Sequence, residues 1–266
     1  MNFFRLCVRK LWRVLFFLNG IVTFIFFFPF FSILLTREEW FPKVFWLKRV
    51  WAKMLIYDVG IRCKIVHSPI MDTSKPFIIC PNHTSFLDII LTYIVFPRYF
   101  HFMGKAELKK VPFFNIFFNK MNILVDRGSI IGSHRAFLRA GDDLDKSISI
   151  AIFPEATIPA CAPRLGRLKN GAFKLAIEKQ VPIVPVVFID NWRLLPDGER
   201  KKTGGTPGVS RVYIHDPIQT TGMTESDLDS LKKRVHNLIE ETLMQFNCSA
   251  EADRITASFP MKKARV

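Results

Sequence analysis

Apolar residues in this chain follow two alternating patterns, short β-branched runs and longer runs with helical spacing. This alternation is typical of an α/β fold, a single layered domain with a mostly parallel central sheet flanked by helices. The predicted strands are residues 61–66, 77–80, 100–103, 123–125, 147–153, 183–188 and 209–214. The predicted helices are residues 85–95, 107–119, 132–145, 171–179 and 225–246. No repeat or low-complexity linker divides residues 58–247, so we assign them to one domain.

A long apolar stretch without a charge, residues 14–36, precedes this domain. As one helix it would extend about 35 Å, enough to cross a hydrocarbon core of about 30 Å. Asn19-Gly20 and Pro29 interrupt it, however, and basic residues flank both ends. These features favour a buckled or re-entrant hairpin that enters one leaflet and returns, with a simple span as the alternative. No small-x-small cleavage site follows, so we expect the stretch to stay in the mature protein.

The apolar positions of the next segment recur at helical spacing, and basic residues fall largely on its other faces. The apolar positions are Val44, Leu47, Val50, Trp51, Met54 and Leu55, and the basic ones are Lys43, Lys48, Arg49 and Lys53. The pattern indicates an amphipathic helix that lies on anionic lipid, and a helix packed on the domain core is the alternative. We therefore assign residues 1–57 to a membrane-associated helical segment and residues 248–266 to a C-terminal tail.

The formal net charge of +15 favours polyanionic partners. The basic residues are spread along the chain and no nucleic-acid-binding signature is present, which favours an anionic phospholipid membrane and an acidic or phosphorylated substrate over nucleic acid. The five cysteines are odd in number and widely spaced, without a C-x-x-C pair. We expect free thiols, with neither a disulfide framework nor a metal site.

A histidine and a carboxylate stand close together in the segment Asn82-His83-Thr84-Ser85-Phe86-Leu87-Asp88. Ser85 followed by Asp88 is typical of a helix N-cap with an acidic partner. His83 would then lie just outside the helix and Asp88 in its first turn, where the helix terminus favours an ionised carboxylate. That carboxylate can accept the proton of one imidazole nitrogen and leave the other nitrogen free as a base. The segment therefore predicts a catalytic dyad.

The same segment resembles the NHxSxxD signature of the phospholipid/glycerol acyltransferases, the family of 1-acylglycerol-3-phosphate O-acyltransferase. Three further stretches resemble that family's other blocks and follow in the same order, namely residues 123–127, 153–157 and 181–185. The resemblance covers about residues 77–188, and residues 169–176 are similar to the family's KxGAFxLA helix start. The predicted strands deliver the first three blocks to loops at their carboxyl ends, so we expect these blocks to share one cleft.

The resemblance implies transfer of a fatty acyl group to the sn-2 hydroxyl of lysophosphatidic acid, which forms phosphatidic acid. The donor would be acyl-CoA or acyl-carrier protein as co-substrate, with no other cofactor and no metal. His83 would act as the general base, and Asp88 would orient it. The resemblance implies that substrate is bound by Asn82, Ser85, Lys105, Arg127, Glu155 and Thr157.

The chain departs from the family pattern in the third block. Ala156 replaces the usual glycine, and Ile158-Pro159 replaces the usual Arg-Ser, so a cation near the phosphate is missing. Arg164, Arg167 or Lys169 could supply this cation. An acceptor with another head group is the alternative.

We expect a membrane location with the catalytic domain on the cytoplasmic face, where thioester donors are made. A catalytically silent lipid-binding homologue is the alternative from a different class of protein. The intact His83 and Asp88 favour the enzyme.

Overall fold

The structure, a computed structural model, describes residues 3–70, 72, 74–107, 116–117, 121–126, 128–197 and 202–248. The helices are α1 (Phe3–Leu34), α2 (Phe41–Tyr57), α3 (Leu87–Val95), α5 (Ile130–Asp145), α6 (Gly171–Lys179), α7 (Asn191–Leu194) and α8 (Leu228–Gln245), with 3-10 turns η1 (Glu38–Trp40) and η4 (Glu225–Asp227). The strands are β1 (Ile61–His67), β2 (Ile78–Pro81), β3 (Phe100–Lys105), β4 (Ile123–Val125), β5 (Ser149–Ile152), β6 (Ile183–Phe188) and β7 (Gly208–Ile214).

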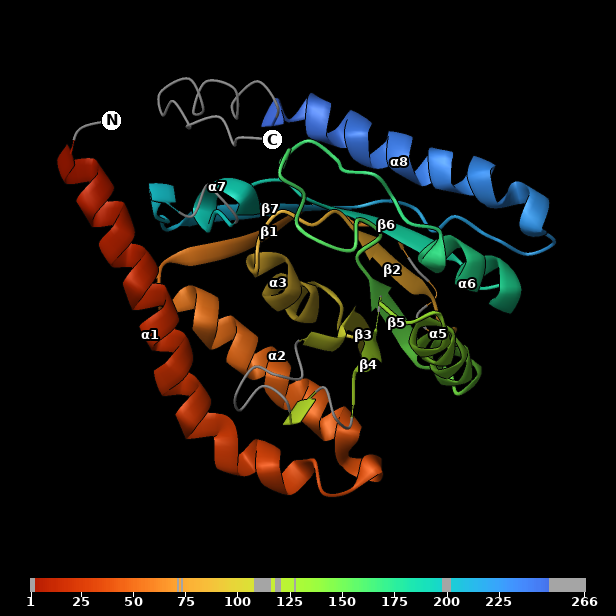
Figure 1. Ribbon diagram of the computed structural model, residues 1–266. Helices are drawn as coiled ribbons and strands as arrows, with labels where there is room; N and C mark the ends of the chain where they lie inside the picture. The colour runs from red at the N-terminus through yellow and green to blue at the C-terminus, as the bar shows by residue number, and fades with distance from the viewer. Residues whose placement is uncertain are drawn as a thin grey trace.

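The strands form one seven-stranded sheet in the order β1-β7-β6-β2-β5-β3-β4 (Figure 1). The strands β6, β2, β5, β3 and β4 are parallel to one another, while β7 is antiparallel to β6 and parallel to β1. The predicted α/β fold with a mostly parallel sheet is therefore confirmed. Because the five parallel strands end at one edge, the loops after them meet there.

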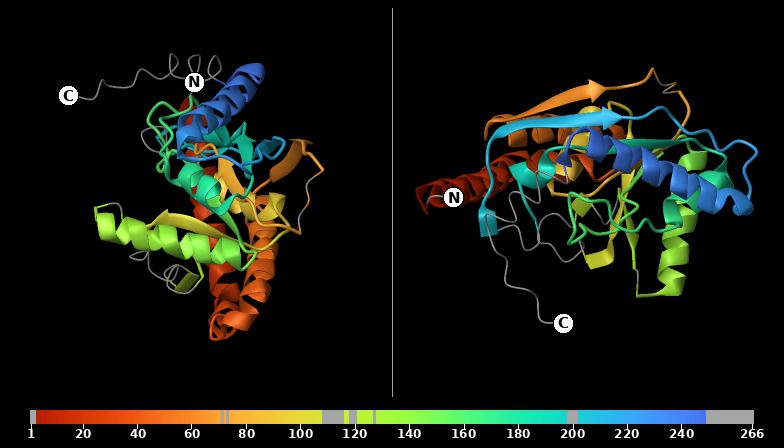
Figure 2. Two further views of the ribbon diagram at one scale, coloured as in Figure 1. Left: turned by 90° about the vertical axis from the view of Figure 1, so that its right-hand side faces the viewer. Right: turned by 90° about the horizontal axis from the view of Figure 1, so that it is seen from above.

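Helices cover both faces of the sheet and bury a separate apolar cluster on each. The apolar side chains of α1, α2 and α3 share one cluster with β2, β3 and β6, and those of α5, α6 and α8 share the other. Figure 2 shows this layered arrangement from two further sides. Strands β2 and β6, with every residue buried, lie in the middle and fix the position of the loops that follow them.

The N-terminal segment differs from the predicted re-entrant hairpin, because α1 continues through Asn19-Gly20 and Pro29. The chain reverses after α1, and α2 returns along it (Figure 1). Polar contacts join the two helices, since the Asn19 amide donates to the Leu55 carbonyl at 3.3 Å and the Trp51 indole donates to the Thr23 hydroxyl at 2.9 Å. The hairpin is thus made by two helices instead of by a break within one.

The orientation of α2 also differs from the predicted lipid-facing helix. Val44, Trp51 and Leu55 are buried in the apolar cluster that α2 shares with α1 and α3. Lys48 is buried as well, with its ammonium 4.2 Å from the Phe117 ring centre. The structure therefore supports the alternative prediction, in which the apolar stripe of α2 packs on the domain.

Element boundaries agree with the predicted ones to within a few residues. The predicted helix 85–95 begins two residues later, at Leu87, although Ser85 still accepts a hydrogen bond from the Leu87 amide at 3.1 Å. The short helix α7 was not predicted. Most of the predicted helix 107–119 and the tail beyond residue 248 lie outside the described residues.

Candidate active site

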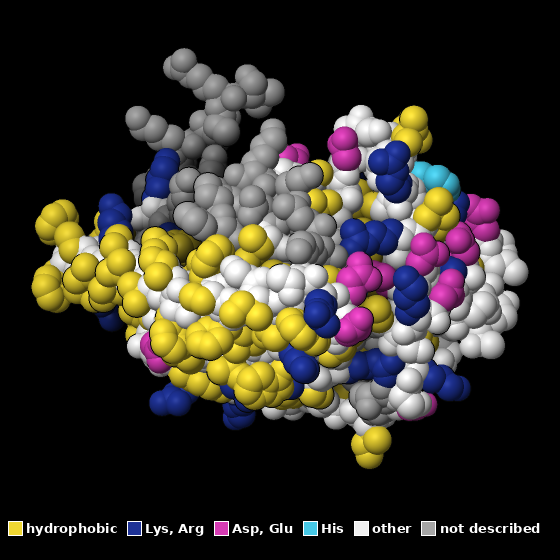
Figure 3. All heavy atoms as spheres, turned by 90° about the horizontal axis from the view of Figure 1, so that it is seen from below, with side chains coloured by type: hydrophobic (Ala, Val, Ile, Leu, Met, Phe, Trp, Pro, Cys, Tyr) yellow, Lys and Arg dark blue, Asp and Glu magenta, His cyan; other side chains and the backbone are white. Residues whose placement is uncertain are grey.

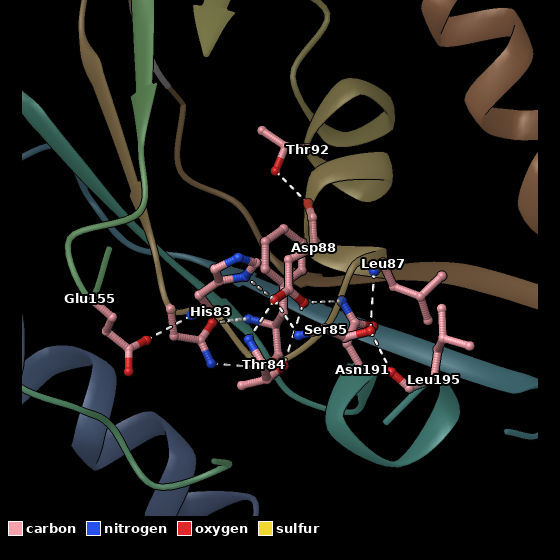
Figure 4. A network of polar contacts seen from close by, with 11 residues as sticks. His83, Thr84, Ser85, Leu87, Asp88, Thr92, Glu155, Asn191 and Leu195 are labelled. Carbon is pink, nitrogen blue, oxygen red and sulfur yellow. Dashed lines mark hydrogen bonds and ion pairs between the residues drawn. The ribbon is translucent and has the colours of Figure 1, made fainter. Parts of the chain in front are cut away.

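The predicted dyad is formed at the carboxyl end of β2. His83 Nδ1 lies 2.9 Å from Asp88 Oδ2 (Figure 4). The His83 side chain is 13% exposed and the Asp88 side chain is fully buried. Among the described residues, no group forms a hydrogen bond with His83 Nε2, so this nitrogen can accept a proton from a bound molecule.

The Asp88 carboxylate is held by donors on both oxygens. Oδ2 also accepts the backbone N–H groups of Thr84 and Ser85, at 2.5 and 2.8 Å. Oδ1 accepts the Asn191 side-chain amide at 2.7 Å, and the Asn191 oxygen accepts the Ser210 hydroxyl at 2.6 Å. These donors satisfy a buried carboxylate in its ionised form. Asp88 is therefore fixed in the orientation that meets the imidazole.

Asn82 and Ser85, predicted to bind substrate, have buried side chains that are paired within the protein. The Asn82 side chain accepts the Phe188 N–H at 2.8 Å and donates to its carbonyl at 3.3 Å, which joins the end of β2 to β6. The Ser85 hydroxyl donates to the Leu195 carbonyl at 2.7 Å. This geometry favours a role in shaping the dyad loop for both residues.

Glu155 lies beside the dyad, and its carboxylate joins two loops. One oxygen accepts the His83 backbone N–H at 2.7 Å, and the other accepts the Gly166 N–H at 2.6 Å. The side chain is 6% exposed, and burial raises the pKa of the carboxyl to about 7. Because both oxygens are occupied by backbone donors, the contacts favour a positioning role over the predicted contact with substrate.

An aromatic side chain supports the imidazole from the third block. Phe153 stacks on the His83 ring with the ring centres 4.1 Å apart, and Phe102 stacks on Phe153 at 6.0 Å. Contacts of this kind limit rotation of the histidine ring and cover one of its faces.

The loop after Glu155 carries the other predicted residues of the third block. Thr157 is exposed. Ala156, at the usual glycine position, has a positive φ of 66°, a conformation that suits glycine better than alanine. The candidate cations Arg164, Arg167 and Lys169 are all exposed. Gly166, the neighbour of Arg167 in the chain, shares the Glu155 carboxylate with the His83 backbone.

The remaining predicted phosphate contacts are Lys105 and Arg127. Lys105 is the last residue of β3, half-buried at the same edge of the sheet. Arg127 lies outside the described residues. Within the part of the chain that the structure describes, no three His, Cys, Asp or Glu side chains gather in a group suited to a metal ion.

Four residues that shape the site were not singled out from the sequence: Asn191, Leu195, Gly166 and Ser210. Asn191 follows β6, a predicted parallel strand, so the rule that ligand loops follow parallel strands could have drawn attention to it. The sequence gives no comparable signal for the other three, since their contacts depend on the tertiary fold.

Comparison with known proteins identifies the family of the segment that carries this site. Residues 62–189 match the family described as acyltransferase. These residues form an acyltransferase domain of this family. Human 1-acyl-sn-glycerol-3-phosphate acyltransferase beta is 25% identical over 79% of this chain and 74% of its own, and mouse 1-acyl-sn-glycerol-3-phosphate acyltransferase alpha is 27% identical over 68% and 63%.

A solved structure supports the fold independently. The crystal structure of the 1-acyl-sn-glycerophosphate (LPA) acyltransferase PlsC from Thermotoga maritima has a TM-score of 0.74 to this chain at 22% identity, and the match covers 91% of this chain and 98% of that one. The overall fold of this chain is thus shared with that solved acyltransferase.

Proposed function

We propose that this acyltransferase transfers a fatty acyl group from acyl-CoA or acyl-carrier protein to the sn-2 hydroxyl of 1-acylglycerol-3-phosphate, which gives phosphatidic acid. The observation that carries the proposal is the His83–Asp88 contact of 2.9 Å, with the second imidazole nitrogen available to a substrate. The names of the human and mouse relatives support the choice of acceptor.

The proposed mechanism is direct transfer with His83 as the general base. Nε2 removes the proton of the acceptor hydroxyl while that oxygen attacks the thioester carbonyl, and Asp88 stabilises the resulting imidazolium. Collapse of the tetrahedral intermediate breaks the carbon–sulfur bond, and the imidazolium returns its proton to the departing thiolate. The products are the ester and a free thiol, and the histidine is neutral again.

The acceptor phosphate needs cationic partners in a partly desolvated site. Lys105 and Arg127 are the proposed contacts from the family resemblance. We add Arg167, because Glu155 ties its neighbour Gly166 to the His83 backbone. Arg167 would then take the part of the arginine that is absent at Ile158.

The outward face of α1 supports a membrane location. This helix is long and apolar enough to cross a membrane by length and composition. One of its faces packs on the domain, and its other face exposes residues that include Val14, Leu18, Ile21, Ile25, Phe26 and Ile33. Figure 3 shows hydrophobic side chains gathered on the surface seen from below, with Lys and Arg nearby. We therefore propose that α1 lies in one leaflet, with the catalytic domain on the cytoplasmic face.

The reaction is tested with purified full-length protein and a panel of lysolipids and donors. Formation of phosphatidic acid, abolished in His83→Ala, supports the proposal. A preference for a lysolipid without a phosphate monoester would contradict the acceptor, and folded protein that transfers no acyl group to any acceptor would favour a silent lipid-binding homologue.

The membrane location is tested by vesicle binding. Ile25 is 66% exposed on α1, and Ile25→Glu should weaken binding to anionic vesicles. Ile70→Glu is the matched control, because Ile70 is exposed in the loop that follows β1. Equal binding by the two variants would contradict the assignment of this face to lipid.

A further inference from the structure

We propose that α7 and the described residues after it, 195–197 and 202–205, form a positioning element for the dyad, with Asn191 as the positioning residue that orients Asp88, and that α1 holds this element in place. The inference rests on the proposed function of the dyad and extends it to a segment outside the four family blocks.

Asn191 completes the fixation of the Asp88 carboxylate. The backbone N–H groups of Thr84 and Ser85 hold Oδ2, while from the same loop Oδ1 accepts a long hydrogen bond of 3.4 Å from the Thr84 hydroxyl. The Asn191 amide binds Oδ1 at 2.7 Å, and Asn191 is itself buried and fixed by Ser210 at 2.6 Å. Contacts on both oxygens define the plane of the carboxylate and keep Oδ2 directed at the imidazole.

The C-terminal end of α7 makes a second contact with the loop that carries His83 and Ser85. The Leu195 carbonyl accepts the buried Ser85 hydroxyl at 2.7 Å (Figure 4). Asp190, just before α7, is in turn bound by Arg193 and Arg211 at 2.6 and 2.7 Å. A displacement of α7 would therefore move both the Asp88 and the Ser85 contacts.

Two arginines of α1 bind the backbone of this element. Arg9 donates to the Thr203 carbonyl at 2.9 Å and to the Arg193 carbonyl at 3.3 Å. Arg13 donates to the Pro196 carbonyl at 2.5 Å. Hydrogen bonds from a charged donor are stronger than neutral ones, so these contacts fasten α7 and its loop to the helix that we place in the membrane.

The loop also approaches α1 too closely for a side chain. The Gly205 N–H donates to the Arg9 carbonyl at 2.9 Å. A Cβ at Gly205 would lie 2.4 Å from the Trp12 ring, and one at Gly204 would lie 2.4 Å from the Arg9 backbone. A substitution that adds a side chain here forces the loop, α1 or the Trp12 side chain to move. The arginine contacts and the glycine packing thus point independently to one junction.

The first test concerns Asn191 and uses full-length protein in detergent with lysophosphatidic acid and acyl-CoA. Asn191→Ala should lower kcat about tenfold or more, because a hydrogen bond to a charged group is lost, while the KM values of both substrates stay unchanged. In an Asp88→Asn background the same change should alter kcat by only about twofold, since the charge is already absent. Full kcat in Asn191→Ala, or equal effects in both backgrounds, would overturn the positioning role.

The second test concerns the hold of α1 on α7. Arg9→Ala with Arg13→Ala should raise hydrogen–deuterium exchange in residues 190–195 and lower kcat toward short-chain, non-micellar substrates. The matched control is Arg5→Ala with Lys10→Ala, which removes the same charge from exposed positions of α1 and should change neither. Gly205→Ala should act like the first double variant.

Equal exchange and equal kcat in the two double variants would overturn the role of α1. If the wild-type protein transfers no acyl group, the proposed function fails, and the exchange measurement alone decides whether α1 holds α7. A rise in exchange that is confined to the Arg9/Arg13 variant would then still support the junction.

Discussion

Replacing Glu155 by glutamine should make the protein more stable and less active. The carboxylate is buried and accepts two backbone N–H groups, from His83 and Gly166. Glutamine has nearly the same shape but only one acceptor oxygen. One of the two N–H groups would therefore face an amide donor, which weakens the hold on the dyad loop.

The size of the stability effect follows from the raised pKa of Glu155. Burial raises it from 4.5 to about 7. Between these two pH values the folded protein keeps a proton that the unfolded chain has released, so the free energy of unfolding falls as the pH rises. At about 1.4 kcal/mol for each pKa unit, the ionised group costs about 3 kcal/mol above pH 7. Glutamine mimics the protonated form and avoids this cost.

Thermal unfolding in detergent at pH 5 and pH 8, together with kcat at pH 8, tests this reasoning. The unfolding temperature of Glu155→Gln should equal that of the wild-type protein near pH 5 and exceed it at pH 8. Its kcat should fall about tenfold, because one backbone donor loses its acceptor at a cost of about 1–3 kcal/mol. Glu178→Gln, which removes an exposed charge, should do neither. A variant that is no more stable at pH 8, with undiminished kcat, would refute the argument.

Three further predictions concern the dyad, the acceptor and the buried lysine. Asp88→Asn should lower kcat less than loss of the catalytic histidine does, because one oxygen remains for the backbone donors; equal losses in steady-state assays would contradict this. Lys105→Ala and Arg167→Ala should each raise KM for lysophosphatidic acid, because each removes a charge-assisted hydrogen bond of about 1.5–3 kcal/mol, and should leave the donor KM unchanged. Lys169→Ala should have little effect, and equal effects on all acceptors would argue against phosphate binding. Lys48→Met should raise the unfolding temperature at pH 7, because burial lowers the pKa of Lys48 to about 7 and the wild-type protein there still carries part of a buried charge. The gain should shrink toward pH 10, where the folded lysine is neutral, and a gain independent of pH would contradict the buried charge.

The parts of the fold that repeat a simple pattern could be predicted from the sequence. The apolar β-branched run of residues 183–188 predicted β6 with the bounds that the structure shows, and the dyad followed from the spacing of His83 and Asp88. The orientation of α2 could not be predicted, since an apolar stripe fits a lipid surface and a protein core equally well.

The contacts that fix the dyad depend on residues far apart in the chain. Asn191 reaches Asp88 only because β6 lies beside β2 in the sheet. The spacing of apolar residues within a strand does not predict the order of the strands. Glu155 resembled a substrate ligand from its motif, but its two backbone partners are set by the path of the loop to Gly166. Sequence patterns thus identified the candidate catalytic residues, whereas the contacts that hold these residues depend on the tertiary structure.

The most direct test of the proposed chemistry is the rate of phosphatidic acid formation by purified His83→Ala beside the wild-type protein, with lysophosphatidic acid and acyl-CoA at saturation. Loss of a general base typically costs about 10² to 10⁴ in rate, and circular dichroism confirms that the variant is folded. We predict a kcat reduced by that factor with an unchanged fold. A folded variant that retains more than about half of the wild-type kcat, far above the residual rate expected after loss of a general base, would contradict the role of His83 as the base.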